Sequence, residues 1–305
     1  MMNELIIKIH DLTYSYGSKN PVLKNVSINV PRGCIYGFLG PNGAGKSTTM
    51  QLLTGILQSE KGSIEVFGRE INQQMPQVFQ RMGTLVESPA LYLHLSGIDN
   101  LRCITTLKGV DERKIPEVLK TVGLENKGNL KVKKYSLGMK QRLAIAMTLL
   151  GDPELLLLDE PVNGLDPTGI TEVRELLVKL NKEHGFTIFI SSHLLSEIEK
   201  MCSHIGIIHH GEIKFEGTMQ ELELKSSKHR VHLVTADVAM QVDILKRKYP
   251  GAVVVNEEEI SLQLENRSKV PELARYAVEN NIPIYQLRLE DNLENWFLSL
   301  TNNAS

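Results

Sequence analysis

The sequence predicts an α/β domain with a mixed, largely parallel sheet, followed by a small α+β module. Short β-branched runs alternate with amphipathic stretches over about the first 225 residues, a pattern typical of a sheet covered by helices. Beyond the polar stretch Leu224–Lys228, strands and helices follow in the order β-α-β-β-α-β, which suggests a ferredoxin-like module. We therefore expect two domains, 1–225 and 226–305.

The first domain begins with segments that lead into a glycine-rich loop. Val26–Val30 and Cys34–Leu39, separated by Pro31-Arg32-Gly33, are predicted to form an antiparallel pair of strands. The loop that follows opens a predicted helix over Lys46–Leu57, because the apolar residues there have helical spacing. Strand patterns then give way to helical ones, which predicts a helical insert over about residues 88–150.

Strands return after the insert. The expected elements are the strands Leu155–Leu158 and Phe186–Ser191, the helix 168–184, the hairpin strands Ile205–His209 and Glu212–Glu216, and a short helix that Thr218 and Glu221 cap. In the second module we expect strands 231–235, 252–256, 260–264 and 284–289, helices 240–248 and 271–279, and a last helix with Leu293, Trp296, Phe297 and Leu300 on one face.

Composition and charge limit the possible partners and compartment. We expect no nucleic-acid partner; the net charge of −2 gives no basic footprint for one, but charge alone identifies no partner. Every apolar run is far shorter than the ~20 residues of a membrane helix, and the first residues lack a signal-peptide pattern. Cys34, Cys103 and Cys202 have no metal-ligand spacing and are interpreted as reduced thiols. We therefore expect a cytoplasmic protein whose membrane role, if it has one, depends on a partner.

The residues Gly40-Pro41-Asn42-Gly43-Ala44-Gly45-Lys46-Ser47 match the phosphate-loop pattern in its required context, after a strand and at the start of a helix. Glycines there let backbone N–H groups surround phosphates, and the helix dipole adds partial positive charge. Lys46 is predicted to reach the β- and γ-phosphates, and Ser47 to bind Mg²⁺. Together with Thr48, these residues form the predicted ATP site.

An acidic pair follows the strand Leu155–Leu158. Asp159 is suited to a direct or water-mediated Mg²⁺ contact, and Glu160 to orienting or deprotonating the attacking water. His193 ends another strand and is predicted to contact the γ-phosphate. Phosphate loops also occur in GTPases and small-molecule kinases. The nearest run to a guanine-binding Asn-Lys-x-Asp motif, Asn181–His184, lacks the final aspartate, which argues against a GTPase.

At this point the sequence resembles the ABC ATPase family over residues 4–224. Tyr135-Ser136-Leu137-Gly138-Met139-Lys140-Gln141-Arg142 is similar to the family's signature loop, and Asn163-Gly164-Leu165-Asp166 to its D-loop. The resemblance makes His193 the switch histidine and Tyr16 the ring that stacks on adenine. It implies a head-to-tail dimer in which Ser136 and Gly138 bind the γ-phosphate of the other subunit's ATP, with Asp166 also at the nucleotide interface.

Two positions depart from the common family pattern. Leu137 replaces the first glycine of the signature loop, and Glu87 stands where most members carry a metal-contacting glutamine. The acidic residue and its surroundings resemble subunits of bacitracin and lantibiotic self-protection exporters. This resemblance implies Glu87 as a metal ligand. It also implies a second ATPase subunit, identical or a close paralogue, and a polytopic permease that holds the chain at the inner face of the membrane.

Two other functions remain open from the sequence. A soluble ABC ATPase that remodels ribosomes or DNA is the main alternative, although such proteins usually carry two ATPase units or long coiled coils. An importer subunit with a ligand-sensing second module is the other, although residues 226–305 show no charge cluster or metal spacing. The leading hypothesis is an exporter ATPase for a peptide antibiotic or a similar amphiphile.

Overall fold

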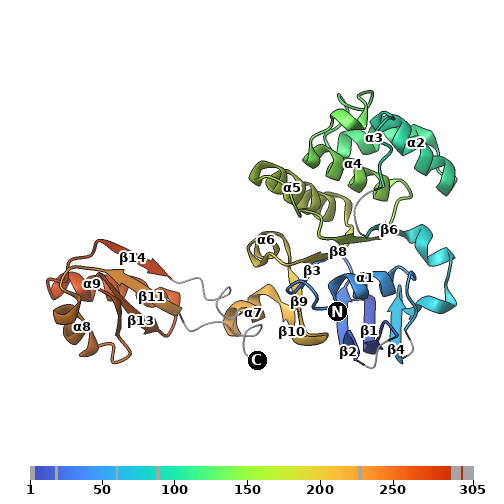
Figure 1. The fold of residues 1–305 in the computed structure, drawn as a ribbon. Coiled ribbons are helices and arrows are strands. Elements are labelled where there is room, and N and C mark those ends of the chain that lie inside the picture. The colour runs from blue at the N-terminus through green and yellow to red at the C-terminus, as the bar shows by residue number, and fades with distance from the viewer. Residues whose placement is uncertain are drawn as a thin grey trace. The chain divides into compact units, whose positions relative to one another are not determined.

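The chain folds into two compact units, Met1–Met219 and Gln220–Ser305, which are treated separately below (Figure 1). The computed structural model describes residues 4–17, 20–59, 61–86, 90–225, 229–289 and 297. The structure divides the units after Met219, at the start of helix α7 (Met219–Lys225). The boundary predicted from the sequence, after residue 225, lies at the end of the same helix.

A six-stranded sheet forms the centre of the first unit, in the order β10-β9-β3-β8-β7-β6. Its strands are β3 (Ile35–Leu39), β6 (Met82–Leu85), β7 (Leu155–Asp159), β8 (Thr187–Ser192), β9 (His204–His209) and β10 (Glu212–Thr218). All neighbours are parallel except β9 and β10, which form the predicted hairpin. Because the carboxyl ends of parallel strands meet at one edge, residues after β3, β7 and β8 are brought together there.

Helices cover both faces of this sheet. Helix α1 (Lys46–Leu53) lies on one face, and α5 (Pro167–His184) and α6 (Leu195–Met201) lie on the other (Figure 1). The close approach of α6 requires a glycine in β3, because a Cβ on Gly37 would lie 2.6 Å from Ile198 Cγ2. Tyr36 and Phe38, on the α1 side, are buried in a core shared with the second sheet.

The second sheet of this unit is antiparallel, in the order β2-β1-β4-β5. Its strands are β1 (Leu5–Tyr14), β2 (Leu23–Pro31), β4 (Lys61–Val66) and β5 (Arg69–Glu70). The predicted antiparallel pairing of Val26–Val30 with Cys34–Leu39 is wrong, because β2 pairs with β1, whereas β3 joins β8 and β9 in the other sheet. The turn between β2 and β3 carries the chain from one sheet to the other. All five residues of β3 are buried, as expected of a central parallel strand.

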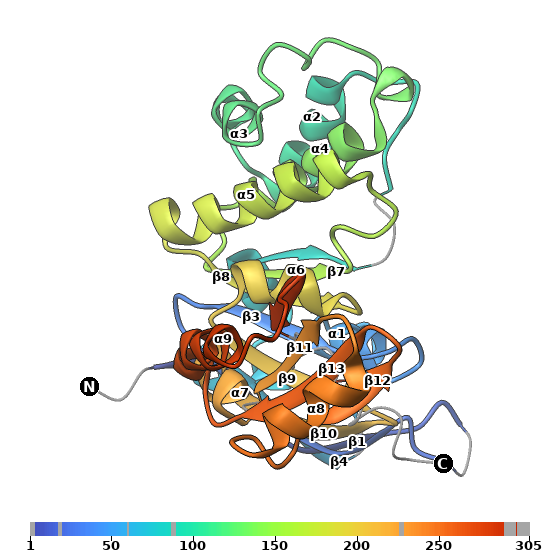
Figure 2. The ribbon, with the colours of Figure 1, turned by 90° about the vertical axis from the view of Figure 1, so that its left-hand side faces the viewer.

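Three helices lie within the predicted helical insert: α2 (Gly97–Lys108), α3 (Ile115–Thr121) and α4 (Leu137–Leu149). Ser96 caps α2 by accepting a hydrogen bond from the N–H of Asp99, and Gly109 ends it at φ 66°. Helix α5 lies between these helices and strands β7 and β8 (Figure 2). Short 3₁₀ turns occupy Ile71–Gln73, Gln77–Arg81, Glu112–Lys114 and Val132–Lys134.

One ion-pair cluster joins distant parts of the first unit. The Glu154 carboxylate lies 2.7 Å from Arg32 Nη1 and 2.5 Å from Arg81 Nε. These hydrogen bonds, Arg81 first and then Arg32, hold the pKa of Glu154 at about 2, below its ordinary value of 4.5. Burial has the opposite effect on two thiols, raising the pKa of Cys34 to about 12 and raising that of Cys202 as well.

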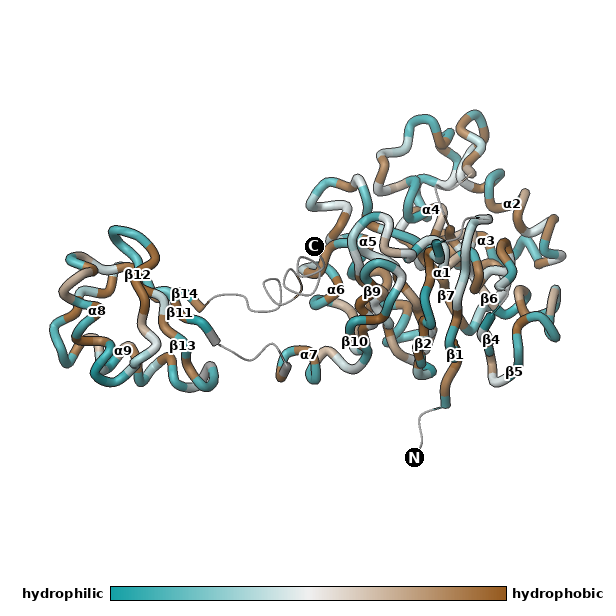
Figure 3. Tube along the Cα trace, turned by 60° about the horizontal axis from the view of Figure 1, so that its bottom comes forward, coloured by the Kyte–Doolittle hydropathy of each residue, from teal (hydrophilic) through white to brown (hydrophobic). Residues whose placement is uncertain are grey.

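After helix α7, the second unit has the predicted β-α-β-β-α-β order. It comprises β11 (His229–Val234), α8 (Val238–Lys246), β12 (Val253–Asn256), β13 (Glu259–Leu264), a 3₁₀ turn (Arg267–Lys269), α9 (Val270–Glu279) and β14 (Gln286–Leu289). The antiparallel sheet order β12-β13-β11-β14 is that of a split βαβ, ferredoxin-like module. Hydrophobic and hydrophilic stretches alternate along its chain (Figure 3). Of the predicted last helix, Phe297 is described and helical, while Leu293, Trp296 and Leu300 lie outside the described residues.

Candidate functional site

A pocket of about 230 Å³ lies at the carboxyl end of β3, around the start of α1. It is lined by Val22, Asn42, Gly43, Gly45, Lys46, Ser47, Thr48, Glu160 and Asn163. Most of these residues are predicted from the sequence as nucleotide-binding or catalytic. Val22 is not, because it carries no chemical signature that marks it outside its three-dimensional setting. Asn163 lies in the segment that resembles the D-loop, but the sequence predicts no binding role for it.

The glycine-rich loop has the backbone conformation that phosphate binding requires. Gly43 and Gly45 have φ of 80° and 111°, in the region that favours glycine. A Cβ on Gly43 would meet nothing within 4 Å, so this part of the loop leaves room for a ligand. No side chain caps α1 at Gly45, and the first N–H groups of a helix have no partner within the helix. The helix start is therefore suited to bind an anion.

Lys46 is buried within this loop, with only 6% of its side chain exposed. Its Nζ donates to the carbonyl oxygens of Gly40 at 2.7 Å and Pro41 at 3.2 Å, and it lies 3.2 Å from Glu160 Oε1. The lysine that the sequence predicts to bind phosphate thus contacts the predicted general base directly.

Glu160 is held in place by its backbone and its side chain. Glu160 directly follows the last residue of β7 and adopts φ 47°, which is unusual for a residue other than glycine. Its other carboxylate oxygen, Oε2, lies 2.9 Å from His193 Nδ1. The carboxylate, 19% exposed, therefore lies between Lys46 and His193. The structure brings together three residues predicted from separate segments.

Asp159 lies opposite Ser191 in the register of the parallel strands β7 and β8. The Ser191 hydroxyl donates a hydrogen bond to Asp159 Oδ1, and it accepts one from the N–H of Glu160 at 2.9 Å. Sequence reasoning does not assign Ser191 a role. The available signal is a hydroxyl at the end of the otherwise apolar, buried run Ile188–Ile190.

Tyr16 lies beside the same helix. Its hydroxyl donates to Gln51 Oε1 at 2.9 Å and lies 3.3 Å from Thr48 Oγ1. Two residues of α1 therefore hold the hydroxyl end of the Tyr16 side chain. The residue is 53% exposed. A half-exposed ring next to the pocket is suited to stack on a base.

The predicted trans-acting residues do not line this pocket. Ser136 is the N-cap of α4 and accepts from the N–H of Met139 at 3.2 Å, and Asp166 is the N-cap of α5 and accepts from the N–H of Gly169 at 2.9 Å. A Cβ on Gly138 would lie 3.7 Å from Gly169 Cα, so the signature segment lies against the start of α5. Leu137 is exposed.

The hard oxygen donors near the loop fit Mg²⁺, because Ser47 offers a hydroxyl and Asp159 a carboxylate. Glu87, the third predicted ligand, lies in the segment 87–89, outside the described residues. Among the residues that the structure describes, no group of three or more His, Cys, Asp or Glu side chains forms a separate metal site.

The chain closely resembles known transporter subunits. Residues 23–163 match the protein-family model for ABC transporter. The chain is 41% identical over 303 residues to the bacitracin transport ATP-binding protein BcrA of Bacillus licheniformis, an alignment that covers 98% of each protein. It is 48% identical over 211 residues to the lantibiotic transport ATP-binding protein SrtF of Streptococcus pyogenes, covering 69% of this chain and 90% of SrtF. The chain belongs to the ATP-binding subunits of ABC transporters.

This ABC subunit also shares its fold with solved ATP-binding cassettes. The cassette MJ0796, solved as a dimer in a post-hydrolysis state with ADP and Pi, is 25% identical, with a TM-score of 0.63 over 70% of this chain and 98% of that one. The family identifies the chain as an ATPase coupled to transport, and its relatives favour an exporter over the ribosome or DNA remodeller. None of the helices in the described segments has the length and apolarity to span a membrane.

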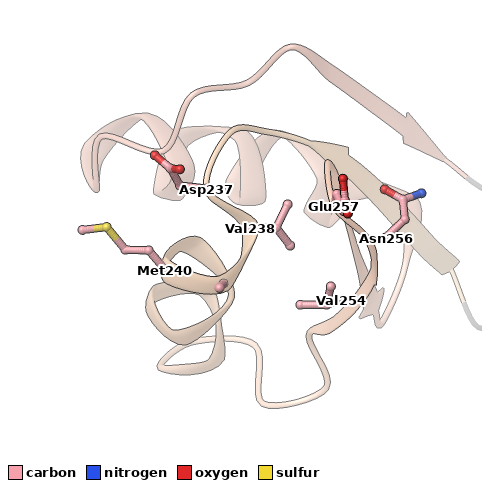
Figure 4. Close-up of a pocket in the computed structure, with 7 residues that line it drawn as sticks. Asp237, Val238, Met240, Val254, Asn256 and Glu257 are labelled. Carbon is pink, nitrogen blue, oxygen red and sulfur yellow. The ribbon is translucent and has the colours of Figure 1, made fainter.

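The second unit contains a pocket of its own, of about 670 Å³. It is lined by Asp237, Val238, Ala239, Met240, Val254, Asn256 and Glu257. Val238 and Val254 point into the space between α8 and β12, whereas Met240 points away from it (Figure 4). None of the predicted nucleotide residues lines this pocket.

Proposed function

We propose that this ABC subunit hydrolyses ATP to power export of a peptide antibiotic of the bacitracin or lantibiotic kind, or a similar amphiphile. The proposal of ATP hydrolysis rests on one observation: the Glu160 carboxylate lies between Lys46 Nζ and His193 Nδ1, beside the phosphate loop. The names of the BcrA and SrtF relatives support the substrate class.

The phosphate loop would bind the triphosphate. Backbone N–H groups at the start of α1 would hold the phosphate oxygens, and Lys46 would exchange its carbonyl and carboxylate partners for the β- and γ-phosphates. Ser47 and Asp159 would hold Mg²⁺, which neutralises phosphate charge when bound. Tyr16 would stack on the base.

Glu160 would act on the attacking water. As a carboxylate at the edge of the pocket, it would orient the water and accept its proton as the water oxygen bonds to the γ-phosphorus. The bond to the ADP oxygen breaks in the same displacement. His193 would hold the carboxylate through Oε2 and contact the γ-phosphate. Ser136, Gly138 and Asp166 would complete the site of a second subunit in a head-to-tail dimer.

The membrane partner would be a polytopic permease that holds this subunit at the inner face of the membrane. Tyr92 and Leu93, at the start of the helical insert, are large hydrophobic residues with about half of their surface exposed. They follow Glu87 closely in the chain, and we propose that this segment faces the permease. Aromatic side chains such as that of Tyr92 are enriched among the residues that anchor protein interfaces.

The test combines hydrolysis with export. The purified chain should hydrolyse Mg-ATP, and Glu160→Gln should lose about 10²-fold or more in turnover while forming ATP-dependent dimers on size exclusion. The subunit would be expressed together with its proposed permease partner in a sensitive bacterium. The minimal inhibitory concentrations of bacitracin and of a lantibiotic should rise, and Glu160→Gln should abolish the rise.

The two parts of the proposal can fail separately. Near-normal hydrolysis by folded Glu160→Gln would remove Glu160 from its role. Unchanged sensitivity to both peptides, with an active ATPase and an assembled permease, would refute the substrate class.

Glu87 has its own test, because a carboxylate next to the γ-phosphate repels it unless a metal lies between them. Glu87→Gln should tighten ATP binding in EDTA and leave Mg-ATP hydrolysis within about tenfold, roughly 1.4 kcal/mol in barrier. Identical EDTA titrations of the two proteins would exclude Glu87 from the metal site.

A further inference from the structure

Ser191 occupies an unusual position for a hydroxyl group. It is fully buried near the carboxyl end of β8, after three buried apolar residues, Ile188–Ile190. A buried hydroxyl destabilises the fold unless it is hydrogen-bonded, and a valine or isoleucine would suit such a strand better. The hydroxyl therefore requires an explanation in terms of what it contacts.

Its two hydrogen bonds go to consecutive acidic residues. The Ser191 hydroxyl donates to Asp159 Oδ1 and accepts from the N–H of Glu160 at 2.9 Å. The same N–H lies 3.2 Å from the Ser191 carbonyl oxygen. One residue of β8 thus bonds to the side chain of Asp159 and to the backbone of Glu160.

The backbone of Glu160 needs such support. Successive side chains along an extended strand point to opposite faces, so a continued strand would direct Glu160 away from Asp159. At φ 47° the chain turns instead, and the carboxylate reaches Lys46 at 3.2 Å and His193 at 2.9 Å. This conformation is unfavourable for glutamate and persists only where surrounding contacts stabilise it.

We infer that Ser191 is a positioning residue for hydrolysis: its hydroxyl orients the Asp159 carboxylate and holds Glu160 in the left-handed conformation. This inference rests on the proposed roles of Asp159 and Glu160. Ser191 does not line the pocket and acts through these two residues. Because displacements near 1 Å at a reacting group cost about 10²-fold in rate, loss of the hydroxyl should reduce turnover without abolishing nucleotide binding.

The chain offers a matched control on the same strand. Thr187, at the other end of β8, is also buried, and its hydroxyl accepts from the N–H of Gly33 at 2.8 Å. In the full-length protein, Ser191→Ala should lower kcat about 10- to 10²-fold and raise the Mg²⁺ concentration for half-maximal activity, with KM for ATP within about twofold. Thr187→Val should lower thermal stability while leaving kcat, KM and the Mg²⁺ dependence unchanged. Ser191→Thr, which keeps the hydroxyl, should restore most of the rate.

A second readout does not depend on activity. In a crystal structure of Ser191→Ala, residue 160 should leave the left-handed region and its carboxylate should separate from His193 Nδ1. If the alanine variant does not fold, Ser191→Cys replaces it in both experiments. Cysteine is nearly isosteric with serine but forms only weak hydrogen bonds, so the same losses in kcat and in the Glu160 conformation are expected. Wild-type kcat and Mg²⁺ dependence in the variant, or an unchanged φ at Glu160, would overturn the assignment. If the wild-type protein itself lacks Mg-ATP hydrolysis, the proposed function fails, and the structure of the variant alone decides the role of Ser191.

Discussion

Substituting Glu160 by glutamine is expected to change nucleotide binding as well as hydrolysis. Lys46 Nζ lies 3.2 Å from Glu160 Oε1, so an incoming phosphate competes with the carboxylate for the same ammonium group. The amide of Glu160→Gln has nearly the same size and no charge. The variant should therefore bind nucleotide more tightly than the wild-type protein.

The size of the effect follows from burial and distance. The side chains are 6% and 19% exposed, so the pair is largely protected from solvent. At 3.2 Å and an effective dielectric of about 20, two unit charges attract by about 5 kcal/mol before desolvation is counted. The net value of a hydrogen bond to a charged group is about 1.5–3 kcal/mol. Removing this competitor should tighten binding roughly tenfold to hundredfold.

The assay is a titration with a fluorescent ADP analogue at protein concentrations where sedimentation shows only monomers, so that dimer closure does not contribute. His193→Ala is the matched control, because His193 contacts the other oxygen of Glu160 and leaves the Lys46 contact in place. It should slow hydrolysis without a comparable gain in affinity. In a Lys46→Ala background, Glu160→Gln should produce no gain.

Equal affinity of the folded Glu160→Gln and wild-type proteins for the analogue would refute the competition between carboxylate and phosphate. A gain that persists without Lys46 would show instead that the carboxylate repels the phosphates directly.

Three further predictions concern stability, thiols and domain organisation. Glu154→Gln should lower the melting temperature of the first unit by about 2–4 °C at pH 7, because its two arginine partners favour the charged form. These partners lower the pKa of Glu154, so protonation at low pH removes their advantage in the wild-type protein. The difference in melting temperature between wild type and variant, measured by scanning calorimetry, should therefore shrink as the pH falls from about 4.5 towards 2. A pH-independent difference would contradict this. In the native protein a thiol reagent should modify Cys103 far faster than the buried Cys34 and Cys202, and equal rates would argue against their burial. Deleting residues 226–305 should leave nucleotide affinity unchanged, and loss of binding by the folded fragment would place part of the site in the second unit.

Local sequence features named most of the residues that line the candidate pocket. The glycine-rich loop, the acidic pair after β7 and the histidine after β8 can each be read from a few consecutive residues. The order of strands and helices in the second unit was predicted equally well, because the hydrophobic patterns of its elements are short and separated by turns. These features depend on contacts between residues near one another in the chain.

Features that depend on distant pairing were not predictable. Pro31-Arg32-Gly33 resembles a hairpin turn, yet β3 pairs with β8, about 150 residues later. The role of Ser191 depends on the register that sets it opposite Asp159, and a shift of one residue would turn its hydroxyl to the other face of the sheet. No local pattern determines that register.

The anchoring of Tyr16 has a consequence for nucleotide choice. Its hydroxyl is engaged with Gln51 and Thr48, so in the proposed stacking the side chain would offer a ring face to the base rather than a hydrogen-bonding group for the base edge. Stacking on an aromatic face accepts every base. Tyr16 therefore provides no means of distinguishing adenine from guanine. The proposed stacking contact by itself should therefore accept GTP nearly as well as ATP, so any preference between the two nucleotides must come from other residues of the site.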